Sequence, residues 1–212
     1  MEYKIYNLET SLGTNTYLVW DEISKEASII DPSNEGRDVL DFIKDNNLKI
    51  KYIINTHAHY DHIGGNDFFK EKLNVPICTS KEASEAISDP KQNLSAYTGY
   101  EVSSSKADKI LFDNDILKLG NKELNIITTP GHSACGISIY CDNLLFSGDT
   151  LFAESVGRTD LPGGNMNTLI KSIKEKLFIL PDETIVLPGH GGSTTIEDEK
   201  IGNPFVGIAA RL

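Results

Sequence analysis

Runs of apolar and β-branched residues recur along the chain at the length of β-strands, and amphipathic patterns separate several of them. TYLVW at 16–20 and ASIID at 27–31 have the composition of strands. KIKYIINT at 49–56 is a nearly continuous apolar run, which predicts a strand buried on both faces. Further strands are predicted at 75–80, 115–120, 124–129, 136–140, 143–147 and 184–187. The pattern therefore indicates a mixed α/β fold.

Apolar positions three and four residues apart predict helices between these strands. The segments with this spacing are 36–48, 66–73, 81–88 and 166–180. In the last of them the apolar stripe consists of Leu169, Ile170, Ile173 and Leu177. Residues 88–108 have no clear period and are predicted to form a long surface loop. Such a loop borders an active site about as often as it is idle, so both interpretations stay open.

The length of 212 residues, without a linker-like change of composition, predicts one compact domain over residues 1–212. Asp and Glu outnumber Lys and Arg by 31 to 20, so the net charge is −11 and neither nucleic acid nor an anionic membrane is an expected partner. The first residues show no signal-peptide pattern, and no apolar run reaches membrane-spanning length. We therefore expect a cytoplasmic protein.

The cysteines Cys78, Cys135 and Cys141 form neither an even set nor a Cys-x-x-Cys pair. They are predicted to be buried free thiols rather than a disulfide framework.

Histidine is concentrated at the ends of the predicted strands. Three of the five histidines lie in THAHYDH at 56–62, and the other two end the segments TTPGH and VLPGH at His132 and His190. Asp149 follows another strand in the segment FSGDT. Because residues from several strand ends can converge at one edge of a sheet, we expect these side chains to meet in one crevice.

The residue types at these positions are those of a metal site. His57 and His59 are two residues apart in an extended segment, so both rings can face the same ion. Asp61 and His62 follow within one turn and can serve a second ion. The full set of candidate ligands is His57, His59, Asp61, His62, His132, Asp149 and His190. Five imidazoles and two carboxylates exceed the needs of one tetrahedral ion, which favours two ions sharing a carboxylate.

A purely structural role for these histidines is less favoured than a metal-dependent catalytic one. Isolated histidines are usually surface or satisfied core residues, but here all five lie at strand ends together with two aspartates. A closed structural zinc site usually contains thiolates, and this candidate set has none.

The segments THAHYDHIGG, TPGH, FSGDT and LPGHG resemble the metal-binding motifs of the metallo-β-lactamase superfamily. The resemblance implies a four-layer αβ/βα sandwich with a binuclear site at the edge where two sheets meet. It assigns His57, His59 and His132 to one ion. Asp61, His62 and His190 are assigned to the other, with Asp149 bridging. Penicillin-degrading members commonly have a cysteine ligand and lack this bridging aspartate, so antibiotic hydrolysis is not expected.

Within the superfamily, SVGRTDLPGGN at 155–165 and the PGHG segment are similar to compact glyoxalase II-like hydrolases, which cleave the thioester of S-lactoylglutathione. We therefore expect a thioesterase of the hydroxyacylglutathione hydrolase type. A water shared by two divalent ions would be deprotonated near neutral pH and act as the nucleophile, and Asp61 would orient it. Zinc is the expected metal, and ligands of this kind also accept Fe or Mn.

Two questions remain open. Persulfide dioxygenases of the same superfamily carry a similar GRTD segment and use one non-haem iron, for which His57, His132 and Asp149 could supply the ligands. The other question concerns Arg158, which resembles in position and charge a glutathione-binding lysine of glyoxalase II. It is predicted either to hold the carboxylate of a small anionic thioester substrate or to form an ion pair with Asp160.

Overall fold

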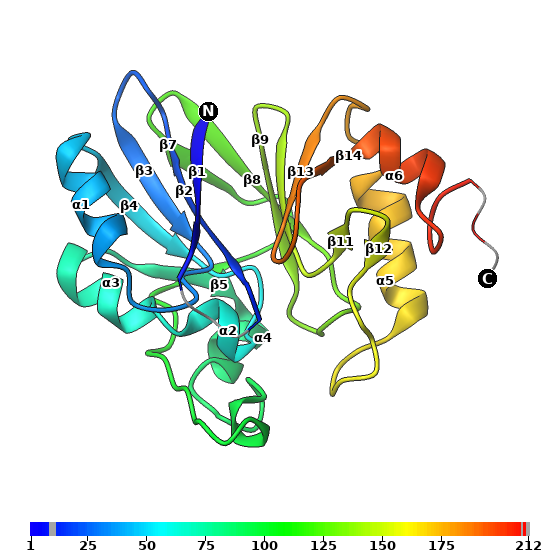
Figure 1. Cartoon of the computed structure of the whole chain (residues 1–212), viewed down its shortest axis with the longest axis horizontal. Helices are drawn as coiled ribbons and strands as arrows, with labels where there is room; N and C mark the ends of the chain where they lie inside the picture. Colours follow the sequence, from blue (N-terminus) through cyan, green and yellow to red (C-terminus); the bar gives the residue numbers. More distant parts are fainter. Residues whose placement is uncertain (9–11, 209, 211–212) are drawn as a thin grey trace.

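The computed structural model describes residues 1–8, 12–208 and 210 and shows two six-stranded sheets face to face, each covered by helices on its outer side (Figure 1). The first sheet has the strand order β1-β2-β3-β4-β5-β6. Its strands are β1 (Glu2–Asn7), β2 (Asn15–Trp20), β3 (Glu26–Ile30), β4 (Lys49–Ile54), β5 (Ile77–Ser80) and β6 (Lys109–Leu111). The pairs from β1 to β3 are antiparallel and those from β3 to β6 are parallel.

The second sheet has the order β14-β13-β10-β9-β8-β7, and in it only β10 and β13 run parallel. Its strands are β7 (Ile116–Leu119), β8 (Lys122–Thr128), β9 (Ile137–Cys141), β10 (Leu144–Gly148), β13 (Ile185–Pro188) and β14 (Thr194–Thr195). A small hairpin of β11 (Leu151–Phe152) and β12 (Ser155–Val156) follows β10.

Helices form the outer layers (Figure 1). The first sheet is covered by α1 (Arg37–Asp45), α3 (Asn66–Leu73) and α4 (Lys81–Ala86). The second is covered by α5 (Met166–Ser172), which continues into a π-helical turn at Ile173–Leu177, and by α6 (Ile196–Gly202). A single turn, α2 (Tyr60–Ile63), and a 3₁₀ turn at Ser95–Tyr97 complete the helical elements. The four-layer αβ/βα sandwich is thus confirmed.

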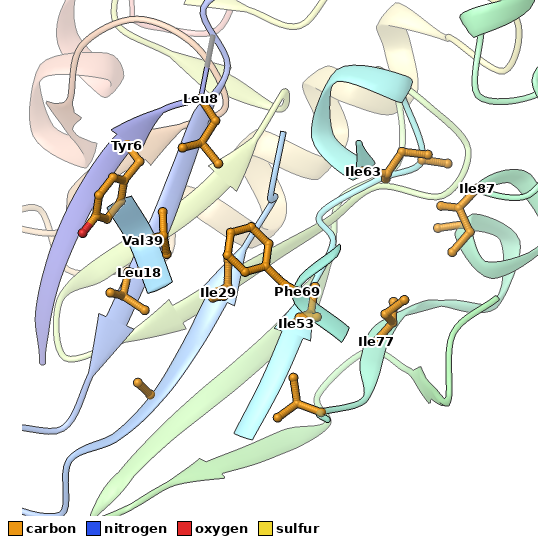
Figure 2. Close-up of a cluster of buried hydrophobic side chains, with 14 of the residues drawn as sticks. Tyr6, Leu8, Leu18, Ile29, Val39, Ile53, Ile63, Phe69, Ile77 and Ile87 are labelled. Atoms are coloured by element: carbon orange, nitrogen blue, oxygen red, sulfur yellow. The ribbon is translucent and has the colours of Figure 1, made fainter. Parts of the chain in front are cut away.

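Three clusters of buried side chains fill the three gaps between the four layers. Successive side chains of a strand point to opposite faces. Leu18 of β2 therefore joins the first cluster, between the first sheet and its helices, while Tyr17 joins the second cluster, between the two sheets. Figure 2 shows the first cluster, in which Val39 of α1 and Phe69 of α3 lie over the strands of the first sheet. Leu145 of β10 belongs to the third cluster, beneath α5 and α6. Alternation in the strands therefore explains how each sheet is apolar on both faces.

The strand β4 is not buried along its whole length, which corrects the prediction for this segment. Only Ile53 and Ile54 are buried, and Lys51 is exposed. A β-bulge leaves Lys51 without a partner in β3, so Ile50 and Tyr52 turn toward different clusters. The extra residue interrupts an apolar run that would otherwise alternate regularly.

Most predicted elements are present, with boundaries that differ by no more than three residues. The apolar stripe of the helix predicted at 166–180 is confirmed, although the helix changes to π geometry at Ile173. The loop at 88–108 contains only a 3₁₀ turn. Elements that the pattern did not predict are short or on edges: β1, β6, β11, β12, β14, α2 and α6.

Two turns fasten the sheets to each other at one end of the strands. Asp21, in the turn between β2 and β3, accepts a hydrogen bond from the N–H of Asn121 in the turn between β7 and β8 (3.2 Å). Glu26 accepts one from the N–H of Gly120 (2.8 Å). Gly120 has φ +60°, and an added Cβ would lie 2.0 Å from the Ser24 hydroxyl, so the contact requires glycine.

The cysteines and the search for membrane-spanning helices concern parts of the chain outside the candidate metal ligands. Cys78, Cys135 and Cys141 are free and buried, as predicted. Within the described part of the chain, no helix is long and apolar enough to cross a membrane.

Candidate metal centre

The seven candidate ligands follow four strands and meet at one edge of the sandwich. His57 and His59 follow β4 directly, and α2 supplies Asp61 and His62. His132 lies between β8 and β9, Asp149 follows β10, and His190 follows β13. Both sheets therefore contribute ligands, and His62, at 0% exposure, is the most enclosed of them.

Three imidazole nitrogens form the first group, which consists of His57, His59 and His132. The Nδ1 atom of His59 is 3.1 Å from Nε2 of His57 and 3.0 Å from Nε2 of His132. Ligand nitrogens about 2.0–2.1 Å from a tetrahedral ion are roughly 3.3 Å apart. The spacing of the first group is thus close to one face of a metal tetrahedron.

The second group consists of Asp61, His62 and His190. The Oδ2 atom of Asp61 lies 3.4 Å from Nε2 of His62 and 3.3 Å from Nε2 of His190. Asp149 lies between the groups, because its carboxylate is 3.4 Å from Nε2 of His62 and 3.6 Å from Nε2 of His132. One carboxylate therefore reaches nitrogens of both groups.

Asp31, which the motif analysis missed, organises two of these histidines. Its Oδ2 accepts hydrogen bonds from Nδ1 of His62 (3.0 Å) and from the hydroxyl of Thr56 (2.6 Å). That hydroxyl accepts in turn from Nδ1 of His57 (3.0 Å). A carboxylate that fixes the outer nitrogen of a histidine turns the other nitrogen toward a metal. The signal was present in the sequence, since Asp31 also ends an apolar strand.

The outer nitrogens of His132 and His190 are held by main-chain carbonyls. Nδ1 of His132 donates to the carbonyl of Arg158 (2.8 Å), and Nδ1 of His190 donates to that of Leu12 (3.1 Å). A carbonyl can only accept, so both Nδ1 atoms carry the proton and both Nε2 lone pairs face inward. This is the tautomer that a metal ligand requires.

The pKa values of the five histidines are set by burial and by the nearby carboxylates. Burial lowers the pKa of every imidazole in the first group, to about 3 for His59. Burial acts in the same direction on His62 and His190, but Asp61 and Asp149 outweigh it and raise these pKa values to about 9 and about 10. Without metal, these carboxylates therefore hold an additional proton on Nε2 of each second-group imidazole, at the position that a metal ion would take.

Two buried atoms provide a direct test of whether metal ions fit. Nε2 of His62 and Oδ1 of Asp149 are 3.4 Å apart and have no hydrogen-bond partner among the described residues. Buried polar atoms are rarely left unpaired, so such atoms require a physical reason. Nitrogen and carboxylate donors with inward lone pairs suit a divalent ion, and the residues present therefore fit a binuclear metal centre.

The chain around residues 14–17 holds the turn that carries His190. The side-chain amide of Asn15 donates to the carbonyls of Pro188 (3.0 Å) and Gly191 (2.9 Å). Tyr17 also donates to Pro188 (2.7 Å). Thr14 donates to Oδ2 of Asp61 (2.8 Å), which fixes that carboxylate. The sequence contains no motif that would identify these polar residues at the start of β2 and just before it.

A cleft of about 740 Å³ opens over the centre. It is lined by ligands from both groups, by Leu94 and Tyr97 of the long loop, and by Phe152 and Arg158. The open question about the loop is thereby settled, because the loop borders the candidate site. Arg158 lies at the rim with its guanidinium on Asp160, through hydrogen bonds of 2.8 Å from both Nε and Nη2.

Comparison with known proteins identifies the superfamily to which the chain belongs. The family model for the metallo-beta-lactamase superfamily matches residues 10–190, and the chain belongs to this superfamily. Among curated relatives, the probable metallo-hydrolase YqgX of Bacillus subtilis is 40% identical over 84% of this chain and 86% of its own. Hydroxyacylglutathione hydrolase GloC of Haemophilus influenzae is 34% identical over 93% of this chain and 94% of its own.

Solved structures with this fold carry different functional names. The BLEG-1 B3 metallo-beta-lactamase has a TM-score of 0.90 at 36% identity, covering 97% of this chain and 99% of its own. ETHE1 from Myxococcus xanthus has a TM-score of 0.79 at 30% identity, with coverages of 97% and 84%. TTHA1623, solved in a di-iron-bound form, has a TM-score of 0.82 at 32% identity, with coverages of 95% and 99%. The chain is therefore a member of a metallo-hydrolase superfamily.

Proposed function

We propose that this protein is a binuclear metal-dependent thioester hydrolase of the hydroxyacylglutathione hydrolase type. The observation that carries the proposal is the position of Asp149, whose carboxylate lies between two groups of ligand nitrogens. A carboxylate shared by two ions is typical of binuclear hydrolytic centres. Similarity to GloC, over nearly the whole of both chains, supports the thioester as the substrate class.

Two divalent ions held by the first and second groups would lower the pKa of a coordinated water and polarise the substrate carbonyl. Asp61 lines the cleft, and Thr14 fixes its carboxylate, so this side chain orients the attacking water and accepts its proton. The water oxygen adds to the carbonyl carbon, the carbon–sulfur bond breaks, and sulfur leaves as a thiolate. Because a thiolate needs little protonation, this centre suits a thioester better than an amide.

The proposal includes zinc as the metal and an anionic thioester as the substrate, with Arg158 binding its carboxylate at the rim. Nitrogen and oxygen ligands accept Zn, Fe or Mn, and similarity to a di-iron-bound structure supports iron as well. The guanidinium of Arg158 is exposed and could move from Asp160 to a substrate carboxylate.

A second candidate function is oxygenation of a persulfide at a single iron. Similarity to ETHE1 supports it, and His57, His132 and Asp149 would supply the ligands. The orphaned Nε2 of His62 favours hydrolysis, because a single iron on those three residues leaves it without a partner. The name of BLEG-1 adds β-lactam cleavage as a further outcome of the test.

The test is to purify the protein, count metal ions per chain, and assay four reactions side by side. These are cleavage of S-lactoylglutathione, cleavage of a simple acyl thioester, β-lactam hydrolysis, and oxygen uptake with glutathione persulfide. Two ions per chain with thioester cleavage is the expected result. One iron with oxygen uptake, or two ions with only β-lactam cleavage, would overturn the proposal.

A further inference from the structure

The walls of the cleft over the metal centre are apolar, although the centre itself is highly polar. Leu12, Leu94, Phe152 and Leu161 come from four separate segments and all line the cleft. None of the four belongs to any of the three core clusters among the described residues. Their side chains therefore lie outside the apolar contacts between the layers, although Leu94 is itself buried, at 9% exposure. Leu12 is 51% exposed, and large apolar surface left in a concave site is typical of a ligand-binding wall.

Leu94 is placed in this wall at a conformational cost. It has φ +71° and ψ 0°, a left-handed conformation that is unfavourable for a bulky residue. Its neighbour Asn93 maintains this conformation, because the Asn93 side chain donates to the carbonyl of Val102 (2.8 Å) and accepts from the N–H of Ser95 (2.9 Å). Backbone strain of this kind is concentrated at functional sites.

Apart from the metal centre at its base, the wall also lacks groups that would neutralise a buried anion. Among the described lining residues, Arg158 is the only arginine or lysine, and its guanidinium is at the exposed rim on Asp160. Away from the metal ligands, a carboxylate against the apolar wall would have no cationic partner among the described lining residues other than Arg158. Burying an unpaired charge is costly, so the cleft selects against it.

From these observations, and resting on the proposed thioester hydrolysis, we propose that the substrate carries a neutral apolar chain next to its scissile thioester. This chain fills the space between Leu94, Phe152 and Leu161, while any carboxylate of the substrate stays outside, at the rim. A lactoyl group, with three carbons and a hydroxyl, is small beside a cleft of about 740 Å³, so the remaining space is open to the thiol half or to a longer acyl chain. The chain can belong to the acyl group or to the thiol, and the experiment distinguishes these sources.

The first arm uses N-acetylcysteamine thioesters with acyl groups from acetyl to octanoyl, and the second uses acetyl thioesters of ethanethiol, butanethiol and hexanethiol. We expect kcat/KM to rise about threefold per methylene in one arm until the cleft is full. Pentanoyl and succinyl thioesters form a pair of similar size, and the succinyl compound should react about 100-fold more slowly. No dependence on chain length in either arm, or equal rates for the pair, would overturn the inference.

Failure of the proposed reaction must be separable from failure of this inference. Binding is therefore also measured by calorimetry with ketone analogues, in which a methylene replaces the thioester sulfur. If no thioester is cleaved, the hydrolase proposal fails, and tighter binding of longer ketones still supports the apolar cleft. Binding that is independent of chain length counts against the cleft whatever the reaction is.

Two variants test the named residues. Leu94→Gly suits the left-handed backbone, which offsets part of the packing lost with a buried side chain, so we expect a small change in Tm together with an approximately tenfold fall in the pentanoyl-to-acetyl ratio. Leu161→Ala should lower the same ratio, whereas Leu180→Ala, which truncates a half-buried leucine that packs on the third cluster, should not. A large loss of Tm in Leu94→Gly with an unchanged ratio would show that Leu94 is a packing residue.

Discussion

At the scale of single residues, the metal centre requires not only its ligands but also a residue without a side chain at position 189. Gly189 precedes the last histidine ligand, and a Cβ at this position would lie 2.2 Å from Oδ1 of Asp149 and 2.7 Å from Cε1 of His62. Both contacts are far shorter than van der Waals distances. The glycine in the PGH turn is therefore required because ligands of both sheets approach the backbone there.

Replacing Gly189 by alanine is therefore expected to displace Asp149 and His62. The protein should lose at least one metal ion per chain and most of its hydrolytic activity. Metal analysis after dialysis measures this, and Gly192→Ala is the matched control, because its Cβ would meet no atom within 4 Å. Equal metal content in the two variants would contradict the assigned role of Gly189.

Asp31 allows a second test at this scale. Asp31→Asn removes the charge that orients His62 and the Thr56 hydroxyl, and loss of such a partner typically weakens metal binding about 10- to 100-fold. Competition with a chelator measures the affinity of each ion. Asp21→Asn, which changes an aspartate away from the centre, is the control and should bind metal normally.

Arg158 and Asp160 can be tested as a pair. If Arg158 binds substrate, Arg158→Ala should raise KM about tenfold for a carboxylate-bearing thioester relative to a neutral one. Asp160→Asn releases the guanidinium and should lower KM for the same charged substrate. If both variants instead change charged and neutral substrates alike, or only lower Tm, the pair braces its loop.

At the scale of elements, the two sheets are joined at one end by polar contacts between turns and at the metal centre by shared ligands. Asp21 is central to the first of these junctions. Hydrogen bonds from the Ser24 side chain and from the main-chain N–H groups of Asn121, Ser24 and Ile23 outweigh burial and lower the pKa of Asp21 to about 2. The contact therefore stabilises the fold only while this carboxylate is ionised.

The pH dependence of stability follows from that lowered pKa. The contribution of Asp21 is fully present above its unfolded pKa of about 4 and is lost as the pH falls toward 2. Asp21→Asn should therefore reduce Tm by about 3 °C at pH 7, and the difference should close between pH 4 and pH 2. Thermal unfolding of both proteins across this range measures it, and a constant difference would show that the charge is not involved.

Comparing the predicted strands and helices with the observed ones shows which features could be predicted from the sequence. The alternation of Leu18 with its neighbours, and the stripe around Ile173, report burial directly, so strands and helices of the core were predicted correctly. The bulge at Lys51 was not, because it depends on the partner strand. Ligand types and strand ends were sufficient to bring the seven candidate residues together. Asp31 and Asn15 were missed because their roles depend on contacts between segments far apart in the chain.

At the scale of the whole molecule, metal ions would act as cross-links between the sheets. The first sheet leads to His57 and His62, and the second leads to His132, Asp149 and His190. Removing the ions should therefore lower Tm by on the order of 10 °C, because tightly bound ligands stabilise the folded state in proportion to the logarithm of their concentration over Kd. Calorimetric scans before and after chelation measure this, and re-addition of zinc should restore Tm. An unchanged Tm would show that the ions do not join the sheets.

The bridge between Thr14 and His190 joins residues separated by most of the chain. During synthesis the ribosome delivers the ligands in order, and His57 to His62 exist long before His190 is made. An incomplete chain that ends after Asp149 carries six of the seven candidate ligands but lacks the turn at 188–191, in which Thr14 pairs with His190 and Asn15 donates to Pro188 and Gly191. Completion of the second ligand group and addition of β13 and β14 to the second sheet therefore both depend on the same late segment of the nascent chain.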